Sequence, residues 1–209
     1  MPDPGKLFVL TAPSGAGKTT LAHALRAADP ALHFSVSFTT RAPRAGEQDG
    51  RDYCFVDRAR FEAMIAADEL LEHAQVFGNY YGTGRGQVEG QTRAGRHVLL
   101  DIDWQGARQV RAHMPESVLI FILPPSLAEL ERRLRGRGTD AEDVIRRRLA
   151  EARDDMGHWP EFDFVVVNDQ VDAALGALRA IIAGQGADHR TTDPTVRRRI
   201  AALFGTSPA

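Results

Sequence analysis

A ten-residue segment near the N-terminus, residues 11–20, constrains the fold of this chain more than any other feature. It reads Thr-Ala-Pro-Ser-Gly-Ala-Gly-Lys-Thr-Thr and lies between an apolar run at 7–10 and a helix-forming run at 21–26. Small residues in such a turn let successive backbone N–H groups point at one oxyanion, and the helix N-terminus adds partial positive charge. The segment therefore predicts a strand, a phosphate-binding turn and a helix.

Two side chains complete this loop. Lys18 supplies a full positive charge, and Thr19 supplies a hydroxyl suited to Mg²⁺. The strict pattern has Gly where this chain has Ala12, and an ordinary glycine-rich turn is the alternative. Against that alternative, Lys6 and Lys18 are the only lysines among 26 Lys and Arg residues, so a compact ammonium is used where phosphates need one. We predict nucleotide phosphate binding by Ala12, Pro13, Ser14, Gly15, Ala16, Gly17, Lys18, Thr19 and Thr20.

The composition limits the class of protein. A length of 209 residues suits one domain with insertions, and 43% hydrophobic with 26% charged residues is ordinary for a globular protein. A net charge of −2 gives no reason to expect a nucleic-acid partner, and no apolar run approaches the roughly 20 residues of a membrane helix. Cys54 is the single cysteine, which fits a reducing compartment. We expect a cytoplasmic protein without a membrane partner, either monomeric or homo-oligomeric.

A second basic segment follows an extended stretch at 32–40. Arg41 and Arg44 stand three apart in a loop rich in Pro and Gly, and Tyr53 returns nearby. Two guanidinium groups and a phenol can converge on a phosphate monoester, because Arg offers a planar fork that matches phosphate oxygens. A solvated basic loop is the simpler alternative if these residues act alone.

The next stretch adds a carboxylate. Residues 57–69 have helical spacing after a plausible N-cap, Asp57, and 70–77 reads as a strand that turns at 78–79 into 80–83. Alternation along the strand places Glu72 on the face opposite Leu71 and His73. A lone Glu is usually a solvated surface charge, but this one lies on an apolar strand close to a tyrosine pair.

These segments together resemble guanylate kinase. The resemblance rests on the phosphate loop, on Ser-Val-Ser-Phe-Thr-Thr-Arg-Ala-Pro-Arg-Ala-Gly-Glu at 35–47 and on Gly-Arg-Asp-Tyr-Cys-Phe at 50–55, and it runs from about residue 7 to 182. Bacterial members often have Ala at the position of Ala12. The resemblance implies the reaction ATP + GMP ⇌ ADP + GDP with Mg²⁺, also with dGMP, and a GMP site of Ser37, Arg41, Arg44, Tyr53, Glu72, Tyr81, Thr83 and Asp103.

The chemistry of guanine agrees with the resemblance. Guanine carries an exocyclic amino group beside a ring N–H, and the carboxylate of Glu72 can accept from both. Ser37 or Asp103 can satisfy further groups on the base. A site built around buried polar groups rejects a base that leaves them unpaired, so this site should prefer GMP to AMP.

The second half of the chain supplies the remaining candidates. The apolar strand at 97–103 ends in Asp101, which we expect near Mg²⁺ or the transferred phosphoryl group, and Asp103, whose simpler role is a helix cap. Arginines at 135, 137 and 148 look like a lid over the phosphates, whereas Arg132, Arg133, Arg146 and Arg147 could be a solvated face. Asn168 resembles the adenine-side residue of the family. The predicted catalytic residues are Lys18, Arg41, Asp101, Arg135, Arg137 and Arg148.

We therefore predict an α/β fold, in which a parallel sheet is flanked by helices and carries a small mixed-β insertion and a helical lid. The core should span 1–33 and 96–187, the GMP-binding insertion 34–95 and the lid about 135–158, with a tail of unassigned role at 188–209. Two other functions remain open. A kinase for a phosphorylated ribose would share the loop and lid, and a catalytically inactive scaffold that binds phosphopeptides would share the fold.

Overall fold

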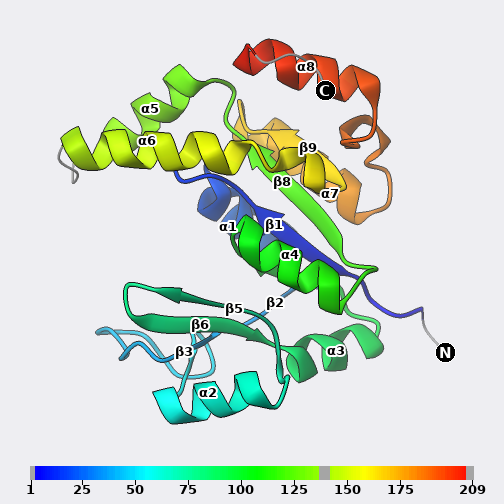
Figure 1. Cartoon of the computed structure of the whole chain (residues 1–209). Coiled ribbons are helices and arrows are strands. Elements are labelled where there is room, and N and C mark those ends of the chain that lie inside the picture. The colour runs from blue at the N-terminus through cyan, green and yellow to red at the C-terminus, as the bar shows by residue number, and fades with distance from the viewer. Residues whose placement is uncertain (1–2, 137–141, 206–209) are drawn as a thin grey trace. The chain divides into compact units, whose positions relative to one another are not determined.

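The computed structural model describes residues 3–136 and 142–205 (Figure 1). The chain divides into two compact units. Unit 1 comprises 1–8, 31–100 and 105–117, and unit 2 comprises 9–30, 101–104 and 118–209. The expected insertion at 34–95 therefore falls within unit 1, and the expected lid at 135–158 within unit 2.

A five-stranded parallel sheet forms the centre of the fold, in agreement with the predicted α/β class. Its strand order is β2-β7-β1-β8-β9. Every residue of the first strand is buried, as is nearly every residue of β8, which explains their continuous apolar sequences. The strands are β1 (Leu7–Thr11), β2 (His33–Phe34), β7 (Val98–Asp101), β8 (Val118–Leu123) and β9 (Phe164–Val167).

Unit 2 surrounds its strands with helices that bury one apolar face each. In α1 (Lys18–Ala28) the buried residues are Leu21, Ala22 and Leu25, and this helix packs against α7 (Val171–Ile182). The helix α5 (Leu127–Arg135) is capped by Ser126, whose Oγ accepts a hydrogen bond from the backbone N–H of Glu129. This helix packs against α6 (Glu142–Met156). Two short 3₁₀ helices, Trp159–Glu161 and Ala187–His189, follow in the later part of the unit.

The tail contains one long helix. This helix, α8 (Pro194–Phe204), begins directly after Asp193, whose side chain caps it by accepting from the backbone N–H of Thr195. Val196, Ile200 and Ala201 are buried, whereas Arg198 and Arg199 are exposed. Within the described residues, no helix is both long enough and apolar enough to cross a membrane.

Unit 1 contains a second sheet of four strands in the order β4-β3-β6-β5. The extended stretch predicted at 32–40 splits into β2 and β3 (Phe38–Thr39). The third strand pairs in parallel with β4 (Cys54–Phe55) and antiparallel with β6 (Asn79–Gly84), which pairs antiparallel with β5 (Leu70–Val76). A small core of Phe61, Met64 and Leu70 lies beneath this mixed sheet. The helices of unit 1 are α2 (Arg58–Ala66), α3 (Arg85–Arg93) and most of α4 (Trp104–His113).

Candidate functional site

The phosphate loop joins β1 to α1 in unit 2, as predicted. Gly15 and Gly17 have φ angles of 88° and 92°, which are strained for any residue with a Cβ. Gly17 is the N-cap of α1 and makes no side-chain cap, so the N–H groups of the first turn keep their capacity to bind an anion. Ala12, Pro13, Ser14 and Ala16 form the turn, and Lys18, Thr19 and Thr20 open the helix.

The structure brings Lys18 and Asp101 together. Lys18 Nζ lies 2.5 Å from Asp101 Oδ1 and donates to the carbonyl oxygen of Ile102 at 3.1 Å. Thr11 Oγ1 donates to the same carbonyl oxygen at 3.1 Å, which fixes the end of β7 beside the end of β1. The exposed fractions of the two charged side chains are 22% for Lys18 and 35% for Asp101, so both are accessible to a ligand.

A cavity of about 480 Å³ lies beside the loop within unit 2. Asn168, which follows β9, is 2% exposed and donates from Nδ2 to the carbonyl oxygen of Ala16 at 2.7 Å. Its Oδ1 is buried and has no hydrogen-bond partner among the described residues. The cavity is lined by Gly17, Thr20, Glu129, Arg132, Arg133, Asn168, Asp169, Gln170 and Val171.

The structure shows that Arg133 does not belong to a solvated face, contrary to the interpretation from the sequence. Its side chain is 23% exposed, and its guanidinium donates to the backbone oxygens of Asn168 at 3.1 Å and Ala16 at 3.4 Å. Glu129 accepts from Arg132 and Arg133, and these two guanidinium groups, the first most strongly, lower the pKa of that carboxyl to about 2. Arg132 remains 74% exposed, as expected for a surface charge.

The predicted lid residues have different surroundings. Arg135 ends α5 and forms ion pairs with Glu131 and, across to α6, with Glu142. The hydrogen bond with Glu142, followed by that with Glu131, raises the pKa of this arginine. Arg148 lies on α6, and Arg137 falls outside the described residues.

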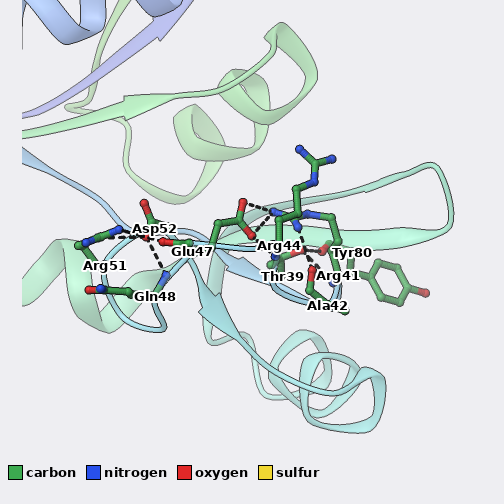
Figure 2. Close-up of polar contacts among 10 residues, drawn as sticks. Thr39, Arg41, Ala42, Arg44, Glu47, Gln48, Arg51, Asp52 and Tyr80 are labelled. Atoms are coloured by element: carbon green, nitrogen blue, oxygen red, sulfur yellow. Dashed lines mark hydrogen bonds and ion pairs between the residues drawn. The ribbon is translucent and has the colours of Figure 1, made fainter.

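Arg41 and Glu47 organise the basic loop of unit 1. Figure 2 shows the Arg41 guanidinium and the backbone N–H of Arg44 meeting on the carboxylate of Glu47. Arg41 Nη2 donates to both carboxylate oxygens at 2.8 and 3.0 Å, and the Arg44 N–H donates at 2.7 Å. The hydrogen bond from Arg41, followed by that from the Arg44 N–H, lowers the pKa of Glu47. The side chains of Arg41 and Glu47 are only 15% and 21% exposed.

Two predicted tyrosines gather around Arg41. Its guanidinium carbon lies 5.3 Å from the centre of the Tyr53 ring, and the Tyr53 and Tyr81 rings meet edge to face with centres 6.0 Å apart. The hydrogen bond to Glu47 is the largest cause that raises the pKa of Arg41, and a hydrogen bond to Tyr81 adds to it. The structure therefore brings together Arg41, Tyr53 and Tyr81, with Arg44 exposed on the same loop.

Glu72 lies on β5 and is 6% exposed. Thr83 Oγ1 on β6 donates to Glu72 Oε1 at 2.6 Å, so the structure also brings these two predicted residues together. The predicted alternation is interrupted: Leu70, Leu71 and Glu72 are buried in succession, and the register with β6 shifts between Leu70 and Glu72. Ser37 lies between β2 and β3 of unit 1, and Asp103 follows β7 in unit 2.

Sequence reasoning assigned no role to Glu47 or Arg133. Glu47 was visible as an acid within the motif at 35–47, yet nothing in the spacing indicates that it bonds Arg41 rather than water. Arg133 contacts the backbone of Ala16, which is 117 residues away in the chain, so no local pattern could identify that contact.

Comparisons with known proteins agree with this arrangement. The sequence model of the family described as guanylate kinase matches residues 4–185. The chain is 54% identical over 202 residues to guanylate kinase of Thiobacillus denitrificans, covering 97% of this chain and 95% of the relative. It is also 54% identical over 200 residues to guanylate kinase of Dechloromonas aromatica, covering 96% and 97% of the two chains.

A solved structure is similar as well. The crystal structure of guanylate kinase from Anaplasma phagocytophilum has a TM-score of 0.69 and 34% identity to this chain, and the match covers 96% and 95% of the two chains. Because the relative from Thiobacillus denitrificans is matched over 97% of this chain, the similarity extends beyond residue 185 into the tail, where the resemblance noted from the motifs had ended.

Proposed function

The chain belongs to the guanylate kinase family, whose members are enzymes that phosphorylate GMP with ATP. From this premise we propose which residues hold each substrate. ATP binds unit 2, with its phosphates on the loop at 12–20 and its base in the cavity beside Asn168. GMP binds unit 1, with its phosphate on Arg41, Arg44, Tyr53 and Tyr81 and its base on Glu72, Thr83 and Ser37. Asp103 follows β7 in unit 2, and its part in the GMP site stays a prediction from the family resemblance.

The observation that carries the GMP assignment is the buried pair of Glu72 and Thr83. The carboxylate of Glu72 is 6% exposed, and its Oε1 accepts a hydrogen bond from Thr83 Oγ1 at 2.6 Å, so the direction of this acceptor is fixed. The adjacent N–H and amino groups of guanine are two donors on one edge, which a carboxylate matches. Adenine lacks that pair of donors, so it cannot donate both hydrogen bonds to the carboxylate.

The observation that supports the adenine side is the buried, unsatisfied Oδ1 of Asn168. The residue Asn168 lines a cavity of about 480 Å³, and the exocyclic amino group of adenine is a donor of the kind that an amide oxygen accepts from. Arg133 closes one side of the same cavity and could pack its planar guanidinium against the base.

Nucleotide kinases generally use Mg²⁺ with ATP, and the donors of unit 2 fit that ion. Thr19 offers a hydroxyl and Asp101 a carboxylate, which are oxygen ligands suited to a hard cation that otherwise binds phosphate oxygens and water. When bound, Mg²⁺ would neutralise charge on the phosphates that are cleaved.

The proposal also gives roles to the basic side chains. Lys18 holds the transferred phosphoryl group, and Arg41 orients the accepting phosphate. The arginines that are proposed to close over the donor and exclude water are Arg135, Arg137 and Arg148.

The test is ADP release from ATP and Mg²⁺, with GMP, dGMP, AMP, CMP or UMP supplied separately. We expect turnover with GMP and dGMP and at most a few per cent of that rate with the other three. Turnover with AMP equal to that with GMP would contradict the base assignment. Measurable GMP binding without turnover would favour a scaffold, and neither binding nor turnover would redirect the search to phosphorylated ribose.

A further inference from the structure

The edge strand of the mixed sheet has an irregularity at the residue before Glu72. In β5, Leu70 pairs with Gly84 and Glu72 pairs with Thr83, so two steps along β5 correspond to one step along β6. Leu71 is therefore an extra residue, the signature of a β-bulge, and it is fully buried. A bulge redirects the side chains that follow it and leaves ladder groups unpaired, so something else must hold the strand here.

The helix α4 supplies the missing partners. Gln109 Oε1 accepts from the backbone N–H of His73 at 3.0 Å, and Gln109 Nε2 donates to the backbone oxygen of His73 at 3.1 Å. One turn further along, His113 Nδ1 lies 2.7 Å from the backbone oxygen of Leu71. Because a carbonyl oxygen only accepts, Nδ1 of this histidine carries the proton.

These contacts bracket Glu72 on both sides. Gln109 uses both ends of its side-chain amide on one residue of an edge strand, as a residue of an additional strand would do. His113 fixes the carbonyl of the bulged residue, and its Nε2 lies 3.7 Å from Asp68 Oδ1. The backbone before and after Glu72 is thus tied to one helix, while Thr83 holds the carboxylate itself.

We propose that Gln109 and His113 are positioning residues for guanine recognition, because they fix the bulge that aims the carboxylate of Glu72. This inference rests on the proposed role of Glu72 in binding the base. Neither residue touches substrate in this proposal. They act by fixing the direction of the Glu72 carboxylate, which must accept from two adjacent donors of the base at once. A small rotation of β5 would prevent the carboxylate from making both hydrogen bonds.

The test uses Gln109→Met, which keeps the length of the side chain and removes both hydrogen bonds. We expect the KM for GMP to rise roughly tenfold, while kcat at saturating GMP and the KM for ATP stay within about twofold. The ratio of kcat/KM for GMP to that for IMP, which lacks the exocyclic amino group, should fall by a similar factor. Gln91→Met is the control, because it makes the same change on α3, where Gln91 accepts from Arg96.

A double-mutant cycle separates positioning from general stability. Glu72→Gln should lower the GMP to IMP ratio roughly a hundredfold, and Gln109→Met should change that ratio less than about twofold in the Glu72→Gln background. A full additional tenfold loss in the double variant would overturn the inference. So would equal losses with GMP and IMP, or a parallel rise in the KM for ATP.

His113 provides an independent pair of variants if Gln109→Met folds poorly. Asn can present its amide donor where His113 Nδ1 lies, whereas Phe fills the space without a donor. We expect His113→Asn to keep the GMP to IMP ratio and His113→Phe to lower it severalfold, and equal ratios for both variants would overturn the proposal. If Glu72→Gln leaves the ratio unchanged, the guanine assignment itself fails. If only the Gln109 and His113 variants are silent, that assignment stands and the positioning inference fails.

Discussion

Two loops of this molecule are proposed to bind phosphate, and they present their hydrogen-bond donors in different ways. The loop at 12–20 in unit 2 relies on its backbone: Gly15 and Gly17 adopt left-handed conformations, and a helix N-terminus follows. The loop at 41–53 in unit 1 relies on side chains, with Arg41 held by Glu47 and flanked by Tyr53. The first region offers donors fixed by the fold, whereas the second must hold flexible guanidinium groups in place.

The carboxylates of Asp101 and Glu47 show how the two loops differ. Asp101 pairs with Lys18, but the lysine is also held by the backbone oxygen of Ile102. Glu47 accepts from both the Arg41 side chain and the Arg44 backbone, so it organises the loop as well as the charge. Removing a side chain from the backbone-built loop should therefore affect chemistry, and removing one from the side-chain-built loop should affect substrate binding.

Lys18→Ala gives the largest expected effect. It removes the charge proposed to stabilise the transferred phosphoryl group and leaves the backbone cradle intact, so kcat should fall roughly 10²- to 10³-fold. The KM for GMP should stay within about threefold, measured by steady-state kinetics. Lys6→Ala is the matched control, since it removes the only other lysine, which is exposed. A comparable loss of GMP affinity in Lys18→Ala would contradict the division between the two regions.

Gly17→Ala tests the backbone itself. Gly17 has a φ of 92°, and an added Cβ would lie 2.4 Å from Asn168 Nδ2, which is held by the carbonyl of Ala16. We expect kcat/KM for ATP to fall at least roughly tenfold, because the loop and Asn168 cannot both keep their positions.

Gly46→Ala is the control for that variant. Gly46 has a similar φ of 88° in the other loop, and an added Cβ there would meet nothing within 4 Å. It should lose only about 1–2 kcal/mol of unfolding free energy through backbone strain, with kcat/KM for ATP unchanged. Equal losses of ATP efficiency in both variants would show that strain, rather than the contact with Asn168, causes the effect.

The contrast between the two loops also explains what the sequence could predict. The phosphate loop is contiguous, and each of its residues has a local reason to be there, so its strand, turn and helix were predicted correctly. The α/β class and the existence of the hairpin followed from local patterns in the same way, although its two-residue turn lies at 77–78 rather than at the predicted 78–79, because Val76 pairs with Asn79. Contacts between distant residues were not predictable, such as those of Arg133 with Ala16 and of Gln109 with His73. The bulge at Leu71 lies beside such contacts, and alternation alone could not indicate it.

Glu47→Gln tests the side-chain-built loop. The neutral amide keeps its size but gives up the charge and one acceptor for Arg41, so the arginine should become less ordered. We expect the KM for GMP to rise roughly fivefold, with the KM for ATP unchanged. Glu62→Gln is the control, because it neutralises the partner of Arg58 in an exposed pair on α2. An unchanged KM for GMP would mean that Arg41 is ordered by its tyrosine neighbours rather than by Glu47.

Glu129→Gln gives the smallest expected effect. It extends the comparison to the cavity beside Asn168, where Glu129 forms ion pairs with Arg132 and Arg133. The pKa of this carboxyl is lowered from 4.5 to about 2, so its contribution to stability is present above pH 4.5 and is lost as the pH falls toward 2. At pH 7 and low salt, Glu129→Gln should melt roughly 1–2 °C below the natural protein, because ion pairs that keep contact with solvent contribute little. The difference should shrink to less than half by pH 3 and should also shrink in 1 M salt. A difference that is the same at pH 7 and pH 3 would mean that the side chain acts through packing rather than charge. Arg133 would then be ordered by the backbone oxygens of Ala16 and Asn168, to which it donates, rather than by Glu129.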